Sequence, residues 1–113
     1  MATLTVQVMK LTGLEETFVA AAAGGDVFAN DGMTFLHVKN GGGSDITVTI
    51  DSLVNSNFGT DVNPAVVVTA GEERMLGLFP KDRFNNASGQ VVVAYSGVTT
   101  VTVAAVRVVQ SGL

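Results

Sequence analysis

Residues 35–51, which read FLHVKNGGGSDITVTID, contain the pattern that decides the fold. Leu36 and Val38 alternate with polar residues before the glycines, and Ile46, Val48 and Ile50 alternate with threonines after them. Alternation with a period of two is typical of a β-strand that has one buried face. The glycines reach positive φ without a Cβ penalty, so the chain can reverse there. We therefore predict a β-hairpin with the aliphatic side chains of both strands on its buried face.

The same alternation places His37, the only histidine of the chain, on the polar face of this hairpin. A hydrolytic triad needs a base that is held by an orienting acid. A histidine in water beside threonines does not fit that role. We therefore predict a surface or interface histidine, and we expect the substitution His37→Ala to cost no more than about 0.5 kcal/mol of stability.

Composition indicates a surface with few charges. Charged residues make up 14% of the chain, against about 25% in an average soluble domain, whereas the hydrophobic share of 47% is ordinary. Such a surface favours a protein that covers part of its exterior in an assembly. The alternative is a monomer with a threonine-rich sheet face. The net charge of −4 argues against nucleic-acid binding.

The 113 residues predict one domain, 1–113. The chain has no cysteine and no apolar run long enough to cross a bilayer. Its start lacks the pattern of a signal peptide, so we expect synthesis in the host cytoplasm and no membrane partner. Further strands are predicted at 3–11, 16–23, 26–30 (as an edge piece), 65–70, 74–79, 90–96 and 99–109.

The last two of these strands predict a second hairpin about Ser96-Gly97, with a bulge at Ala104-Ala105 where the valine phase reverses. Residues 52–63 and 80–89 are expected to be loops, with Phe58 and Phe84 as anchors. With about eight short strands and no helix, the pattern predicts an all-β protein, an antiparallel β-sandwich of jelly-roll-like arrangement.

No catalytic or metal-binding pattern emerges from the sequence. The acidic pairs Glu15-Glu16 and Glu72-Glu73 are adjacent residues, which point in opposite directions on an extended chain. The acidic residues at 26–32 miss the ligand spacing of a calcium loop. The glycine run is followed by no helix with a lysine, as a phosphate loop requires. We expect no enzyme activity, no cofactor and no metal.

Two stretches are predicted to form the interface of an assembly. Three consecutive valines cannot all face one core from a single strand, so a neighbouring chain is expected to cover part of this run. The N-terminal strand at 2–8 is the second candidate, as a docking strand. The interface residues are Thr3, Leu4, Thr5, Val6, Val66, Val67 and Val68.

Most of the chain resembles small proteins of tailed-phage and prophage virion regions. The resemblance rests on residues 30–41 (NDGMTFLHVKNG), on 73–80 (ERMLGLFP) followed by Phe84-Asn85, and on the closing stretch 91–107. These motifs look structural and carry no active-site residue. The resemblance implies a head decoration (cement) protein that binds the major capsid protein or neighbouring virion proteins on the capsid surface. A homotrimer would match the local three-fold positions of an icosahedral shell.

Two alternatives stay open. One is a head–tail joining or tail component of the same particle. The other is a small ligand- or carbohydrate-binding β-sandwich, although a lectin-like site usually presents aromatic rings, and this chain has one tyrosine and no tryptophan.

Overall fold

The computed structural model describes residues 2–52 and 63–108. These residues form ten short strands and one four-residue helix, α1 (Lys81–Phe84). The predicted anchor Phe58 lies outside the described residues, as does most of the loop predicted at 52–63. The predicted all-β class is confirmed, and the strands pack as a sandwich of two five-stranded sheets.

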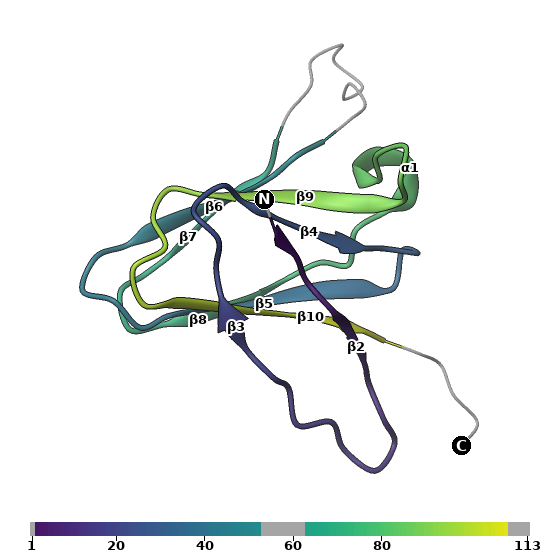
Figure 1. Cartoon of the computed structure of the whole chain (residues 1–113), viewed down its shortest axis with the longest axis horizontal. Helices are drawn as coiled ribbons and strands as arrows, with labels where there is room; N and C mark the ends of the chain where they lie inside the picture. Colours follow the sequence, from purple (N-terminus) through teal and green to yellow (C-terminus); the bar gives the residue numbers. More distant parts are fainter. Residues whose placement is uncertain (1, 53–62, 109–113) are drawn as a thin grey trace.

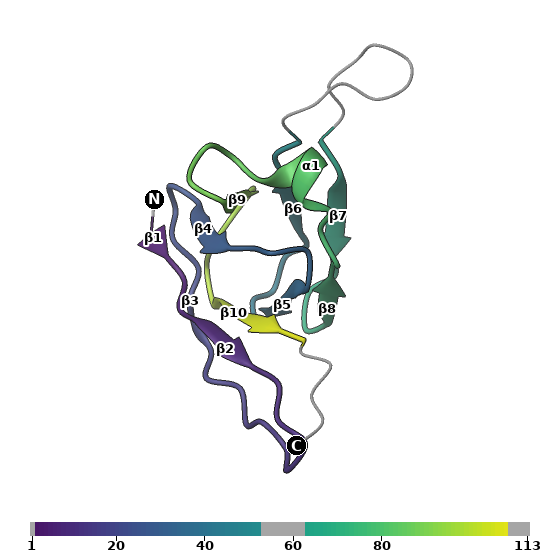
Figure 2. The same cartoon turned by 90° about the vertical axis from the view of Figure 1, so that its right-hand side faces the viewer.

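The two sheets lie one above the other when the sandwich is viewed along its strands (Figure 2). Sheet A has the order β1 (Ala2–Thr3), β4 (Asp26–Ala29), β9 (Gln90–Tyr95), β6 (Ile46–Ile50) and β7 (Ala65–Val68). Sheet B has the order β2 (Val6–Val8), β10 (Val101–Arg107), β5 (Thr34–Asn40) and β8 (Glu73–Leu76). The short strand β3 (Val19–Ala20) also pairs with β10, beside β2.

The hairpin predicted at 35–51 is wrong, although both of its strands exist. β5 pairs with β10 and β8 in sheet B, whereas β6 pairs with β7 and β9 in sheet A. The glycine run therefore carries the chain from one sheet to the other. The predicted buried face is confirmed, since Leu36, Val38, Ile46, Val48 and Ile50 are all buried. Alternation identifies the face of a strand, but it does not identify the neighbouring strand.

The second predicted hairpin is wrong for the same reason. β9 belongs to sheet A and β10 to sheet B, so the turn at Ser96-Gly97 also joins the two sheets. The bulge predicted at Ala104-Ala105 is absent, because β10 keeps one continuous register with β5 from Val101 to Arg107. Val106 is 1% exposed although it points away from the sandwich interior. The reversed valine phase at Val106 therefore arises because this side chain is covered on the outer side of sheet B.

The N-terminal segment changes sheets along one edge of the sandwich. β1 pairs with β4 and β2 pairs with β10, both in parallel, and Leu4 between them is buried. Figure 1 shows this segment crossing the edge in purple. The sheets are therefore mixed rather than purely antiparallel as predicted, and β4 lies inside sheet A rather than at its edge. The jelly-roll-like arrangement stays a prediction.

The segment predicted as a strand at 16–23 is a strand only at Val19–Ala20. Its backbone elsewhere is irregular, and the side chains of Glu16 and Phe18 contact His37 on the outer side of sheet B.

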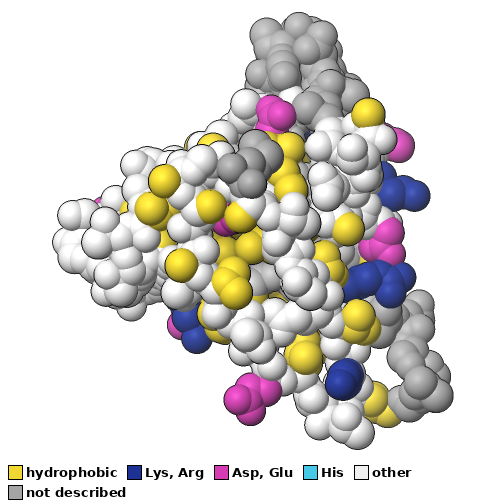
Figure 3. Space-filling view, in the orientation of Figure 1, with side chains coloured by type: hydrophobic (Ala, Val, Ile, Leu, Met, Phe, Trp, Pro, Cys, Tyr) yellow, Lys and Arg dark blue, Asp and Glu magenta, His cyan; other side chains and the backbone are white. Residues whose placement is uncertain are grey.

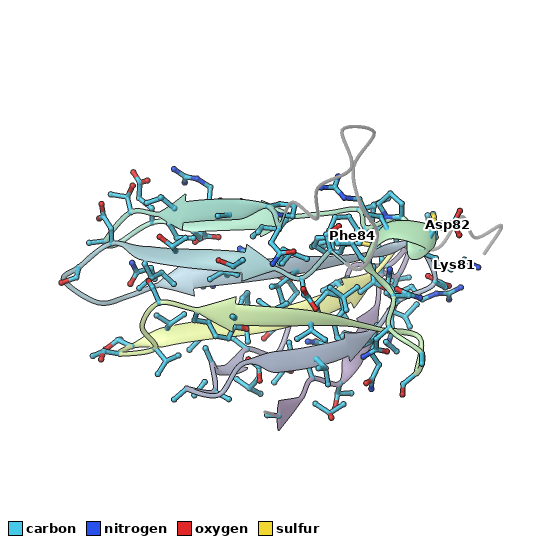
Figure 4. All side chains as sticks on the ribbon, turned by 90° about the horizontal axis from the view of Figure 1, so that it is seen from above. Lys81, Asp82 and Phe84 are labelled. Atoms are coloured by element: carbon cyan, nitrogen blue, oxygen red, sulfur yellow. The ribbon has the colours of Figure 1, made fainter. Side chains whose placement is uncertain are left out.

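The core fills the space between the sheets with aliphatic side chains and closes at one end with aromatic rings. Phe79 packs against Phe28 and Phe84, with ring centroids 5.8 Å and 5.5 Å apart. Phe84 lies in α1 and points into the sandwich, while Lys81 and Asp82 of the same helix are exposed (Figure 4). The predicted anchoring by Phe84 is thus confirmed, with a helical turn in place of part of the predicted loop.

Candidate functional site

The outer side of sheet A carries only uncharged side chains along its strands. Alternation and register identify which side chains point away from the interior. They are Thr3, Val27, Ala29, Thr47, Thr49, Ala65, Val67, Gln90, Val92 and Ala94. We call this surface the neutral face, and Figure 4 looks down on it. Asp51, one residue beyond β6, is charged, and its N–H donates to the carbonyl of Val92 in β9 over 2.9 Å.

The outer side of sheet B is different, because it carries charged groups and is partly covered by the chain itself. His37 and Lys39 lie on it in β5, and Glu73 and Met75 lie opposite them in β8. Glu16 and Phe18, from the segment before β3, contact His37 there. The two outer surfaces of the sandwich therefore differ in charge.

The structure divides the seven predicted interface residues into three groups. Leu4 and Val68 belong to the core of this chain. Val66 and Val6 are half-buried and pack against the core from its edges. Thr3, Thr5 and Val67 are exposed, and Val67 keeps 53% of its surface in water. Because successive side chains on a strand alternate between faces, only Val67 of the three valines lies on the neutral face.

The prediction that His37 faces water is wrong. His37 is 5% exposed. Its Nδ1 lies 2.9 Å from Oε2 of Glu16, and its Nε2 lies 2.7 Å from Oε1 of Glu73. The ring of Phe18 packs edge-on against the imidazole, with centroids 4.9 Å apart. The side chain projects from the polar side of the strand, as predicted, but residues 16–18 cover it there.

This arrangement gives His37 a structural role. A carboxylate accepts hydrogen bonds, so both contacts are satisfied when both ring nitrogens carry a proton. A histidine whose two nitrogens already meet carboxylates has no free nitrogen to abstract a proton from a substrate. The carboxylates also lie on opposite sides of the ring, so the three groups do not converge on one point.

Residues 16–18, which we call the covering segment, are held in place by further contacts. The side-chain amide of Gln7 donates to the carbonyl of Thr17 over 2.9 Å, and its oxygen accepts from the N–H of Thr17 over 2.8 Å. The ammonium of Lys39 lies 4.1 Å from the centroid of the Phe18 ring. The contacts of the covering segment to β2 and β5 make it an integral part of sheet B's outer surface.

A second polar pair lies in the interior of the sandwich. Asp26 is fully buried, and its Oδ2 accepts a hydrogen bond from the hydroxyl of Tyr95 over 2.8 Å. Burial, and then this bond to Asp26, raises the pKa of Tyr95. This pair was not predicted from the sequence, although Tyr95 shares the inward phase of Val91 and Val93 and therefore needs a buried partner for its hydroxyl.

Shallow hollows lie along the edges. One of about 320 Å³ is lined by Thr3, Thr5, Gln7, Thr17 and Ala104 among others, on the N-terminal edge that faces the viewer in Figure 3. Its walls hold hydroxyl, amide and aliphatic groups but no ionisable side chain. Another of about 240 Å³, beside β8, is lined almost wholly by apolar side chains such as Phe35 and Leu78.

Within residues 2–52 and 63–108, no three His, Cys, Asp or Glu side chains are grouped so that they could hold a metal ion. No helix within these ranges has the length and apolar character needed to span a membrane.

Comparison with protein-family models, with curated proteins and with solved structures found no match to this chain.

Proposed function

We propose that this protein is a structural component of a phage virion, a capsid decoration (cement) protein that binds the assembled head through its neutral face. The observation that supports this proposal most directly is the charge difference between the two sides of the sandwich. The strands of the neutral face expose only Thr, Ala, Val and Gln side chains, whereas the other side carries His37, Lys39 and Glu73.

The physical basis is the cost of removing a surface from water. Burying a charged group requires an opposite partner of good geometry, whereas burying short aliphatic and hydroxyl side chains does not. Apart from Gln90, the neutral face has short side chains that lose little conformational entropy when they become ordered. Of the two outer sides of the sandwich, it is therefore the one that another protein can cover at the lower cost.

The environment of His37 adds support for a structural role. The only histidine of the chain is buried between two carboxylates and ties the covering segment to sheet B. Its two ring nitrogens contact Glu16 and Glu73, so His37 stabilises the fold of the described residues.

The test is co-sedimentation of the purified protein with assembled capsid shells of the phage that encodes it. Ala94 is exposed in the central strand β9, on the neutral face. Ala94→Asp should weaken binding to shells, because it places an unpaired carboxylate in the contact. Met75→Asp is the matched control: Met75 is 64% exposed on the other side of the sandwich, so binding should be unchanged.

Bound protein should also raise the temperature at which the shells dissociate, because a ligand that prefers the assembled state stabilises it. If the protein fails to bind shells, the capsid proposal is wrong. Co-sedimentation with tails or with head–tail connectors, and not with shells, would favour the tail or joining role instead. Sensitivity to Met75→Asp with no effect of Ala94→Asp would move the contact to sheet B.

A further inference from the structure

Among the described residues, one side of the β7 backbone has no strand partner. The N–H of Ile50 donates to the carbonyl of Pro64 over 2.9 Å, and the register places Val66 opposite Val48. In an antiparallel pair, hydrogen-bonded positions alternate along the strand. Val66 therefore directs its backbone groups to β6, while Ala65 and Val67 direct theirs to the opposite side. No described strand pairs with β7 on that side, since β7 ends the order of sheet A.

The other edges of the sandwich differ from β7. On the N-terminal side, β1, β2 and β3 have only two or three residues each. On the opposite side, β8 ends sheet B and begins with Glu73 and Arg74, both exposed. Short length and charged side chains are the usual means by which proteins prevent pairing at a sheet edge. β7 has four residues, as β8 does, but its sequence Ala-Val-Val-Val carries no charge, so it lacks the charged side chains that protect β8.

We propose that β7 pairs in antiparallel fashion with β7 of a second copy of this chain, which joins two copies of sheet A into one continuous sheet. A two-fold axis places the same surface of each copy opposite itself. Like charges at such a contact would repel each other, and β7 has none. The free backbone groups of Ala65 and Val67 supply the hydrogen bonds, and Val67, now 53% exposed, becomes covered by its counterpart.

This inference does not depend on the proposed function, but it has a consequence for it. The axis of an antiparallel edge contact runs perpendicular to the sheet, so both neutral faces look in the same direction. A dimer would thus offer two adjacent docking faces to one shell, which raises its apparent affinity. The expected assembly is a dimer, in place of the trimer expected from the sequence.

The experiment measures the mass of the full chain in solution across micromolar concentrations by light scattering and sedimentation equilibrium. The wild-type protein should have twice the mass of one chain. Val67→Pro removes an N–H that β6 does not use, and Val67→Lys brings two ammonium groups together across the axis. Each variant should remain folded, as its thermal melt followed by circular dichroism shows, and should raise the dimer Kd about tenfold or more.

Met75→Lys is the matched control, because it adds the same charge to an exposed residue of the neighbouring edge strand β8, and it should leave the dimer intact. If Val67→Pro fails to fold, Val67→Lys decides. A wild-type monomer, a wild-type trimer, or a dimer that Met75→Lys breaks and Val67→Lys does not, would overturn the inference. Shell binding is measured separately, so a dimer that binds no shell would refute the proposed function alone.

Discussion

Nε2 of His37 lies 2.7 Å from Oε1 of Glu73, and this contact joins the outer sides of two neighbouring strands, β5 and β8. The other ring nitrogen of His37 meets Glu16, which comes from an irregular segment 21 residues earlier in the chain. One imidazole thus connects three parts of sheet B's outer surface.

His37→Ala is expected to lower the free energy of unfolding by about 1–3 kcal/mol, measured by urea denaturation at neutral pH. The substitution removes the contacts of both ring nitrogens and leaves a carboxylate of Glu16 without this partner. The partly exposed contact with Glu73 contributes the smaller share, because water screens it. This expectation replaces the small cost that the sequence alone suggested.

Met75→Ala provides the control for His37→Ala, because Met75 lies directly opposite His37 on β8 and is 64% exposed. Its cost should stay within about 0.5 kcal/mol. Equal effects of the two substitutions would contradict the structural role assigned to His37.

Stability should fall in alkaline solution because of Tyr95. Burial and the bond to Asp26 raise the pKa of Tyr95 above its ordinary value of 10.0. The folded state therefore holds this proton more tightly than the unfolded state does. Its contribution to stability is complete below the ordinary pKa and is lost as the pH rises above it. Thermal melts at increasing pH should show this loss, and the phenolate absorbance of the only tyrosine should appear together with unfolding.

Tyr95→Phe separates this effect from the titration of lysines. At neutral pH the variant should be less stable by about 1–3 kcal/mol, because the buried carboxylate of Asp26 loses a donor. Above the ordinary pKa of tyrosine, the difference between the variant and the wild type should shrink. A difference that is the same at every pH would refute the raised pKa.

Val48→Asp and Val101→Asp are each expected to prevent folding. Both side chains are at most 1% exposed, one in each sheet, so the substitution places an unpaired charge in the core. Val67→Asp makes the same chemical change on β7, where the side chain is 53% exposed, and this variant should fold. Circular dichroism and soluble yield measure the outcome. A soluble Val48→Asp with an unchanged melt would contradict the assigned faces of β6.

Gly25→Ala is expected to cost clearly more stability than Gly13→Ala. Both glycines have positive φ, +93° and +99°, so an alanine at either position is strained by about 1–2 kcal/mol. A Cβ at Gly25 would also lie 2.6 Å from the carbonyl oxygen of Val93, whereas a Cβ at Gly13 would meet nothing within 4 Å. The close approach should add about 1–3 kcal/mol. Paired denaturation curves measure the difference, and equal costs would contradict this backbone contact.

The neutral face could be inferred from the sequence only in part. Thr47 and Thr49 alternate with buried residues, so their outward direction was predictable. The low charge content also predicted a surface suited to assembly. Which threonines and alanines share one surface depends on strand order, and that order places Thr47 beside Val67 and Thr49 beside Ala94.

The sequence by itself determined the secondary structure class and the buried face of the main strands. Local alternation is a property of each strand, and the inward positions of Leu36, Val38, Val48 and Ile50 follow from it without knowledge of any neighbour.

Only the tertiary structure decided which strands pair. The turns after Asn40 and Tyr95 are compatible both with a hairpin and with a crossing between sheets, because glycine permits either path. The choice depends on the pairing of β5 with β10 and of β6 with β9, which are contacts between distant parts of the chain. The burial of His37 has the same origin. Its partners Glu16 and Glu73 reach it only after sheet B has formed, so no local pattern around His37 could indicate them.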